Sequence, residues 1–133
     1  MKKILTIIII NIFCFGNAYS KDLTGTKIKC TLASMETYLE FTSYDQVVKW
    51  DFMPSAIKYW KWNNFYRVNI KNIEFSWMKN FEKKEPSSLN RETLQYGSFD
   101  CELIANGNKF DIENYLEEQV KILTENQKKK NKI

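Results

Sequence analysis

Histidine is absent from this chain of 133 residues, and glycine, proline and cysteine are rare, with four, two and three residues. Without histidine the chain has no side chain that ordinarily titrates near neutral pH, no Ser-His triad and no imidazole ligand for a metal. So few glycines also leave no phosphate-binding loop and no dinucleotide fingerprint. We therefore predict a protein that is not an enzyme, with no catalytic residues, no metal site and no cofactor.

The first 20 residues have the composition of a secretory signal peptide. Lys2 and Lys3 precede an apolar run over residues 4–16, and the small residues Ala18 and Ser20 form a small-x-small cleavage pattern. The run is shorter than the stretch of about 20 apolar residues that spans a membrane. We expect cleavage after Ser20 and an exported protein, periplasmic or secreted, with no stable membrane anchor. An uncleaved helical anchor is the alternative.

Cleavage at this position would discard Cys14 and leave two cysteines, Cys30 and Cys101. An even pair of cysteines in an oxidising compartment predicts a disulfide bond. The rest of the chain has the length of one domain, which we place at residues 21–127.

The basic character of the chain lies at its two ends. Beyond Lys2 and Lys3 there are 18 basic and 16 acidic side chains, and four of the basic ones lie in residues 128–133. We interpret residues 128–133 as a basic disordered tail. Without that tail the body of the chain is slightly acidic, so together with export this argues against a nucleic-acid partner.

Short runs of alternating apolar and polar residues dominate the chain from residue 26 onward. Asn, Asp, Gly and Ser interrupt these runs, which is typical of antiparallel strands joined by short turns. The charged stretch at residues 80–90 contains Pro86 and is expected to be an exposed loop. We predict eight strands, at residues 26–32, 37–43, 46–52, 56–62, 65–70, 73–79, 91–96 and 98–104.

The periodicity changes near the C-terminus. Apolar residues recur there at spacings of three and four, which predicts an amphipathic helix over residues of about 111–127. Asp111 is the expected N-cap. The apolar stripe consists of Ile112, Tyr115, Leu116, Val120 and Leu123.

These elements predict an all-β fold with one C-terminal helix, in which about eight strands form an antiparallel meander. The sheet is either a small closed barrel or strongly curved. A bridge between Cys30 in the first strand and Cys101 in the last needs Cα atoms within about 7 Å, which favours closure. With Leu23-Thr24-Gly25 before the first strand, this layout is similar to lipocalin-like small barrels, which carry a C-terminal helix outside an up-and-down barrel. The resemblance implies an architecture.

The most aromatic stretch is AIKYWKWNNFYRVNI at residues 56–70. If the two asparagines at 63–64 form a turn, alternation places three large rings and two cations on one face of a hairpin. That face either packs against the helix or forms a platform, with rings that stack on a ligand and cations that hold an acidic group. A slip of one residue in the turn inverts the faces. The candidate ligand-binding residues are Lys58, Trp60, Trp62, Phe65 and Arg67.

Two functions fit this sequence. The first is a monomeric exported binding protein that takes a small apolar or sugar-like ligand in or at the mouth of a barrel. The second is an interaction or inhibitor-type protein of the cell envelope, which contacts a protein partner through residues 80–90 or through an exposed aromatic face. An internal cavity would favour the first, whereas a filled interior with an exposed apolar patch would favour the second.

Overall fold

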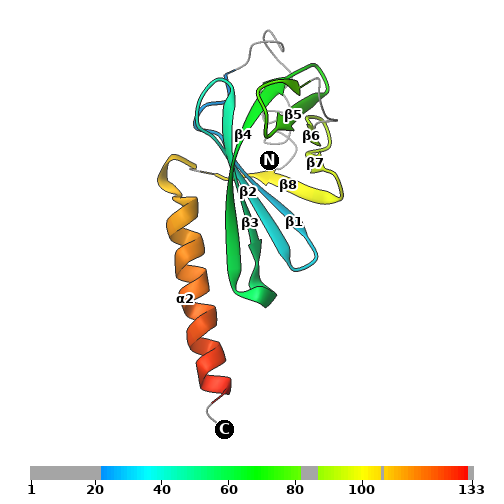
Figure 1. Ribbon diagram of the computed structural model, residues 1–133. Coiled ribbons are helices and arrows are strands. Elements are labelled where there is room, and N and C mark those ends of the chain that lie inside the picture. Colours follow the sequence, from blue (N-terminus) through cyan, green and yellow to red (C-terminus); the bar gives the residue numbers. More distant parts are fainter. Residues whose placement is uncertain (1–21, 82–86, 106, 132–133) are drawn as a thin grey trace.

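The computed structural model describes residues 22–81, 87–105 and 107–131. Its eight strands follow one another in sequence order around a closed antiparallel barrel, with one helix outside it (Figure 1). The strands are β1 Lys27–Leu32, β2 Met35–Phe41, β3 Gln46–Met53, β4 Lys58–Val68, β5 Asn72–Ser76, β6 Ser87–Asn90, β7 Gln95–Tyr96 and β8 Phe99–Leu103; short 3₁₀ turns lie at Pro54–Ala56 and Gly107–Lys109, and helix α2 spans Ile112–Lys130. The predicted fold class is confirmed. The signal peptide predicted for residues 1–20 lies outside the described residues.

The barrel closes where β8 returns to β1. Cys30 and Cys101 stand directly opposite each other in that antiparallel pair, with Cα atoms 3.9 Å apart, and they form the predicted disulfide. The hydrogen bond from Ile104 N to Lys27 O continues the pairing beyond the last strand. The covalent bond therefore fastens the first strand to the last.

The predicted Asn-Asn turn is wrong. Asn63 and Asn64 lie within the single strand β4, where they pair with Val48 and Val47 of β3. Eight consecutive residue pairs join β3 to β4, and this continuous ladder outweighs the local preference of two asparagines for a turn. The chain reverses instead at Pro54–Ala56, after which Ile57 adopts a left-handed backbone with φ 52°.

One strand was not predicted. β6 lies inside the stretch interpreted as a loop at residues 80–90, of which residues 82–86 lie outside the described part of the chain. The strand predicted at residues 91–96 is reduced to the two residues of β7, because a turn occupies residues 91–93. Two predicted strands merge into β4 and one unpredicted strand appears, so the count of eight is preserved.

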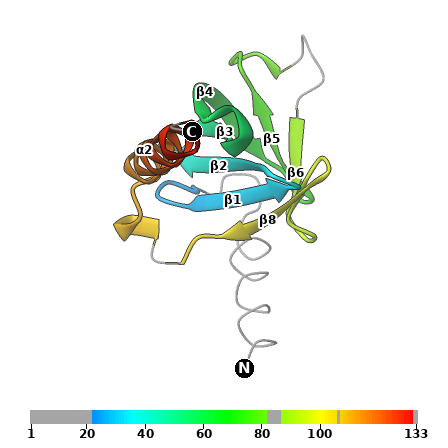
Figure 2. The same ribbon diagram turned by 90° about the horizontal axis from the view of Figure 1, so that it is seen from below.

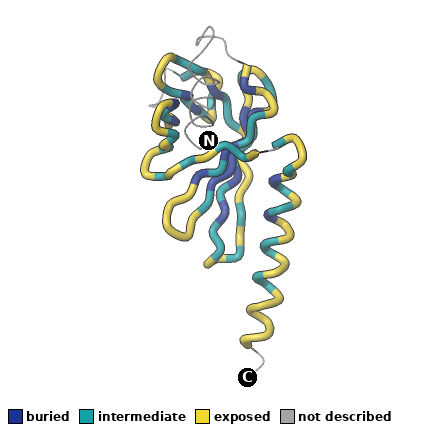
Figure 3. Tube along the Cα trace, turned by 180° about the vertical axis from the view of Figure 1, so that it is seen from behind, coloured by how far each residue is buried: buried dark blue, intermediate teal, exposed yellow. Residues whose placement is uncertain are grey.

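Aromatic rings pack against one another in the barrel interior. Phe41 packs edge-on against Tyr66 with ring centres 4.7 Å apart, and Phe75 lies 6.1 Å from Phe41 and 5.6 Å from Tyr96. Buried aliphatic side chains from five strands and from the segment before β1 complete this core: Leu23, Ile28, Leu39, Val47, Ile73 and Leu89. Figure 3 shows the buried positions concentrated in the middle of the strands.

Helix α2 covers part of the outer surface. Asp111 caps its first turn by accepting a hydrogen bond from Asn114 N at 3.0 Å, as the sequence predicts. The apolar stripe packs against the outer side chains Tyr38, Trp50 and Phe52, with Ile112 and Leu116 fully buried. Seen from below, the helix lies outside the sheet beside β2 and β3 (Figure 2). It continues to Lys130, so the first residues of the predicted basic tail are helical.

Candidate functional site

The strands of the barrel differ in length, and this exposes part of the inner surface. β1 to β4 have six to eleven residues, whereas β5 to β8 have two to five. The hairpins β1–β2 and β3–β4 consequently extend past the shorter strands at one end of the molecule (Figure 1). We call the inner-facing residues at that end the aromatic platform: Leu32, Met35, Met53, Lys58, Trp60 and Trp62.

Two tryptophans form the centre of the aromatic platform. Trp60 and Trp62 share the inner face of β4 with the core residues Tyr66 and Val68, because alternate residues of a strand face the same side. The exposed fractions of Trp60 and Trp62 are nonetheless 41% and 50%. The rings therefore lie on a face whose continuation is core, yet they remain open to solvent.

A carboxylate holds one of these rings in place. Asp51 stands opposite Trp60 on one side and opposite Thr37 on the other. Its Oδ1 accepts a hydrogen bond from the buried Thr37 hydroxyl at 2.8 Å, and its Oδ2 accepts one from Trp62 Nε1 at 3.0 Å. Both carboxylate oxygens thus accept a hydrogen bond, and one of these bonds orients the Trp62 indole.

A lysine lies beside this network on the same inner face. Lys49 stands opposite Trp62 in the register. Its Nζ lies 3.6 Å from Asp51 Oδ2 and 5.6 Å from the centre of the Tyr96 ring. Tyr96 belongs to the core, so the ammonium reaches from β3 toward the barrel interior.

The structure separates the five predicted site residues into two groups. Lys58, Trp60 and Trp62 share the inner face, whereas Phe65 and Arg67 lie on the outer face, because β4 runs straight through the expected turn. Arg67 is already engaged, with its Nη2 2.8 Å from Glu74 and its guanidinium over the Phe81 ring at 4.6 Å. Phe65 and Arg67 therefore do not belong to the aromatic platform.

Sequence analysis missed Thr37, Lys49 and Asp51. Their proximity to the tryptophans depends on the pairing of β2, β3 and β4, which a single-sequence pattern does not give. One signal was available: in QVVKWDF, Lys49 and Asp51 alternate with Val48, Trp50 and Phe52 and share their face with Val47. Charged residues are uncommon on the core-facing side of a strand and are usually paired there.

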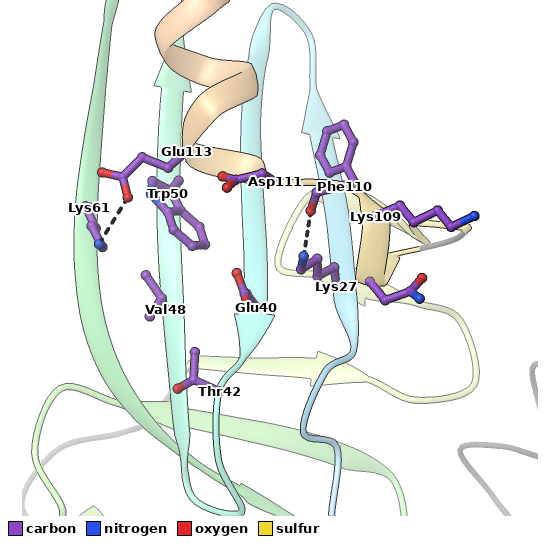
Figure 4. Close-up of a pocket in the computed structure, with 11 residues that line it drawn as sticks. Lys27, Glu40, Thr42, Val48, Trp50, Lys61, Lys109, Phe110, Asp111 and Glu113 are labelled. Atoms are coloured by element: carbon purple, nitrogen blue, oxygen red, sulfur yellow. Dashed lines mark hydrogen bonds and ion pairs between the residues drawn. The ribbon is translucent and has the colours of Figure 1, made fainter.

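A groove of about 400 Å³ lies on the opposite side of the long strands, between their outer face and the first turn of α2 (Figure 4). Lys27 Nζ donates to Phe110 O at 2.5 Å, and Lys61 Nζ lies 3.3 Å from Glu113 Oε2. These contacts fasten the helix to the sheet, and the Asp111 carboxylate is used as its cap. Lys27, Lys61 and Glu113 thus serve helix docking, and we place no ligand in this groove.

The fold and the platform together define a closed eight-stranded antiparallel barrel with one outer helix and an exposed aromatic inner face at one end. No protein-family model matches the chain, and no curated protein or solved structure shows significant similarity to it. Among the described residues, no helix combines the length and apolar character needed to cross a membrane.

Proposed function

We propose that this chain is an exported, non-enzymatic binding protein that takes a small, partly apolar ligand on the aromatic platform. The observation that carries the proposal is the exposure of Trp60 and Trp62 on the inner face of the barrel. Export is supported by the leader-like first 20 residues and by the Cys30–Cys101 disulfide, since such bonds persist in oxidising compartments.

The packing of the interior supports a ligand position at the end of the barrel rather than in its centre. Phe41, Tyr66, Phe75 and Tyr96 pack against one another in the core, with ring centres 4.7 to 6.1 Å apart. The platform begins where this packing ends, because the shorter strands do not extend over it. A ligand would therefore rest against the two indoles at the mouth.

The indoles are suited to this role in two ways. A tryptophan ring offers a large apolar contact area at a low cost in conformational entropy, and its face stacks on aromatic rings or on the apolar faces of sugars. The hydrogen bond from Trp62 Nε1 to Asp51 Oδ2 also orients one ring in advance. Such preorganisation lowers the entropic cost of binding.

A protein partner is the second candidate function. The exposed apolar side chains Leu32 and Met35 adjoin the tryptophans in the platform, and such patches on small proteins also mark protein interfaces. A protein partner would use the same face, so the size of the occupant distinguishes the two functions. We favour the small ligand because Thr37, Lys49 and Asp51 add a compact polar group beside Trp62 that can orient a small molecule.

A fluorescence titration tests the proposal with the neutral dye N-phenyl-1-naphthylamine, which brightens in apolar surroundings. We expect saturable binding to the wild-type protein and a loss of at least about tenfold in affinity for Trp60→Ala and for Trp62→Ala. Trp77→Ala is the matched control, since Trp77 is 65% exposed and lies in the bend after β5. Equal affinity in all four proteins would refute the small-ligand site, and self-association lost only in the platform variants would favour a protein interface.

A further inference from the structure

We infer that the ligand of the aromatic platform carries an anionic group, and that Lys49 is the residue that selects it. This inference rests on the proposed function, because it names the chemical class of the ligand for the same site.

The inner face of the four long strands carries one acid and two bases. Alternation places Lys49, Asp51 and Lys58 on this face, and the other inner-facing residues of β1 to β4 are uncharged. Lys58 is exposed and has no ion-pair partner among the described residues. The face therefore has a net positive charge of one, which favours an anionic ligand over a cationic one.

The single acid already has partners at both of its oxygens. The two oxygens of Asp51 accept hydrogen bonds from Thr37 and from Trp62, as described above. A cationic ligand would have to compete with these two donors and would also approach Lys49. Asp51 is thus best regarded as a positioning residue for Trp62.

The ammonium of Lys49 differs from the Asp51 carboxylate in its hydrogen bonding. A lysine has three N–H donors, yet Lys49 Nζ makes no hydrogen bond within the described part of the chain. Its distance of 3.6 Å from Asp51 Oδ2 exceeds the 2.7–2.9 Å that is typical of a charge-assisted hydrogen bond. The Lys49 side chain is only 23% exposed, so water access is restricted and a ligand oxygen would supply what the ammonium lacks.

The register brings this donor to one end of the tryptophan pair. Along β4 the order on the inner face is Lys58, Trp60 and Trp62, and Lys49 stands opposite Trp62. Successive inner residues of a strand are spaced by about 6.6 Å. A flat apolar ring system that stacks on both indoles would thus place a substituent next to Lys49, at the end that lies over Trp62. The expected ligand is an aromatic or alicyclic carboxylate, sulfonate or phosphate.

Two dyes with the same ring skeleton provide the test. N-phenyl-1-naphthylamine is neutral, and 1-anilinonaphthalene-8-sulfonate is the same molecule with one sulfonate group. We expect the wild-type protein to bind the anionic dye about tenfold more tightly than the neutral one. This preference should shrink as the salt concentration rises, because ions screen exposed charges.

Variants of Lys49 test whether this residue causes the preference for the anionic dye. Lys49→Met keeps an unbranched apolar side chain and removes the charge, so it should abolish the preference for the anionic dye, with the affinity of the same variant for the neutral dye as the reference. Lys49→Arg should retain the preference. Lys61→Met is the control, because Lys61 lies on the same strand pair but faces the helix. A melting temperature close to that of the wild type shows that each variant is folded.

The possible failures are distinguishable. If both dyes bind with equal affinity to the wild type and to Lys49→Met, the inference about the anionic group is overturned while the platform itself stands. The inference also fails if Lys61→Met removes the preference as strongly as Lys49→Met. If neither dye binds to the wild type, the proposed small-ligand function fails, and this inference fails with it.

Discussion

Trp50 on β3 and Trp62 on the neighbouring strand β4 are the same residue type in two different settings. Trp50 points to the outer face, where helix α2 covers it and leaves it 4% exposed, whereas Trp62 points to the inner face and is 50% exposed. Hydropathy does not distinguish the two positions. What differs is whether another element of the fold covers that side of the strand. The exposed rings of Trp60 and Trp62, on a sheet face that is otherwise core, are the basis of the proposed binding surface.

The largest expected effect is at the covered tryptophan. Trp50→Ala should lower the free energy of unfolding by about 3–5 kcal/mol, because it removes a large buried side chain and leaves a cavity between helix and sheet. Urea denaturation measures this change. A loss below about 1 kcal/mol would show that α2 does not cover the outer face in solution.

The barrel must be closed for an inner face to exist, and the disulfide secures that closure. Replacing Cys30 and Cys101 together by alanine should cost roughly 4 kcal/mol, since the bridge closes a loop with a sequence separation of 71 residues. The denaturation midpoint of the double variant under identical conditions tests this. Free labelling of both thiols in the native wild-type protein would contradict the closed barrel.

The covering role of the helix can be tested on adjacent residues. Leu116→Ala should destabilise the protein by about 2–4 kcal/mol, because Leu116 is fully buried against the outer face. Glu117→Ala is the neighbouring control on the exposed side of the helix and should change stability by less than about 0.5 kcal/mol. Thermal denaturation of the pair compares them, and equal midpoints would mean that the helix is not docked.

A smaller effect depends on pH. Tyr38 lies under the helix and donates a hydrogen bond to Glu36 Oε2 at 3.0 Å, and burial, reinforced by the Glu36 carboxylate, raises the pKa of its hydroxyl far above 10. The folded protein therefore favours the protonated Tyr38 hydroxyl more strongly than the unfolded chain does. Below pH 10 the hydroxyl is protonated in both states, and its contribution to stability is fully present. That stabilisation is lost as the pH rises beyond 10, because the unfolded hydroxyl ionises first.

The variant Tyr38→Phe isolates this contribution. It should cost about 1 kcal/mol near neutral pH, since it removes one hydrogen bond and no ring. The stability of the variant should also fall less steeply than that of the wild type above pH 10, although Tyr66, whose pKa burial also raises, keeps part of the slope. Parallel pH profiles for the two proteins would contradict the assignment to Tyr38.

Much of the fold could be predicted from local pattern. Period-two alternation located most strands, and the stripe with Leu116 located the helix, because these signals repeat over several residues. β6 was missed because Leu89 is the one apolar residue among its four, although it is fully buried. Asn63 and Asn64 were misread because their turn preference is local, whereas the pairing with β3 that overrides it is not.

The candidate site was predictable only in part for the same reason. Trp60 and Trp62 stood out by composition, but the face of Phe65 depended on a turn that does not form. The position of Lys49 beside Trp62 depends on the register between β3 and β4, which is a tertiary property. Sequence pattern thus found the rings of the platform and missed its polar partners.

The double variant Trp60→Ala/Trp62→Ala is the most direct test of the central claim that the platform is a binding surface and not core. Its denaturation midpoint and its affinity for N-phenyl-1-naphthylamine should be measured on the same preparation. We predict that stability falls by less than about 2 kcal/mol per tryptophan, because about half of each side chain is already exposed, and that binding of the dye is abolished. A loss of about 3 kcal/mol or more per tryptophan, or unchanged binding, would contradict the account.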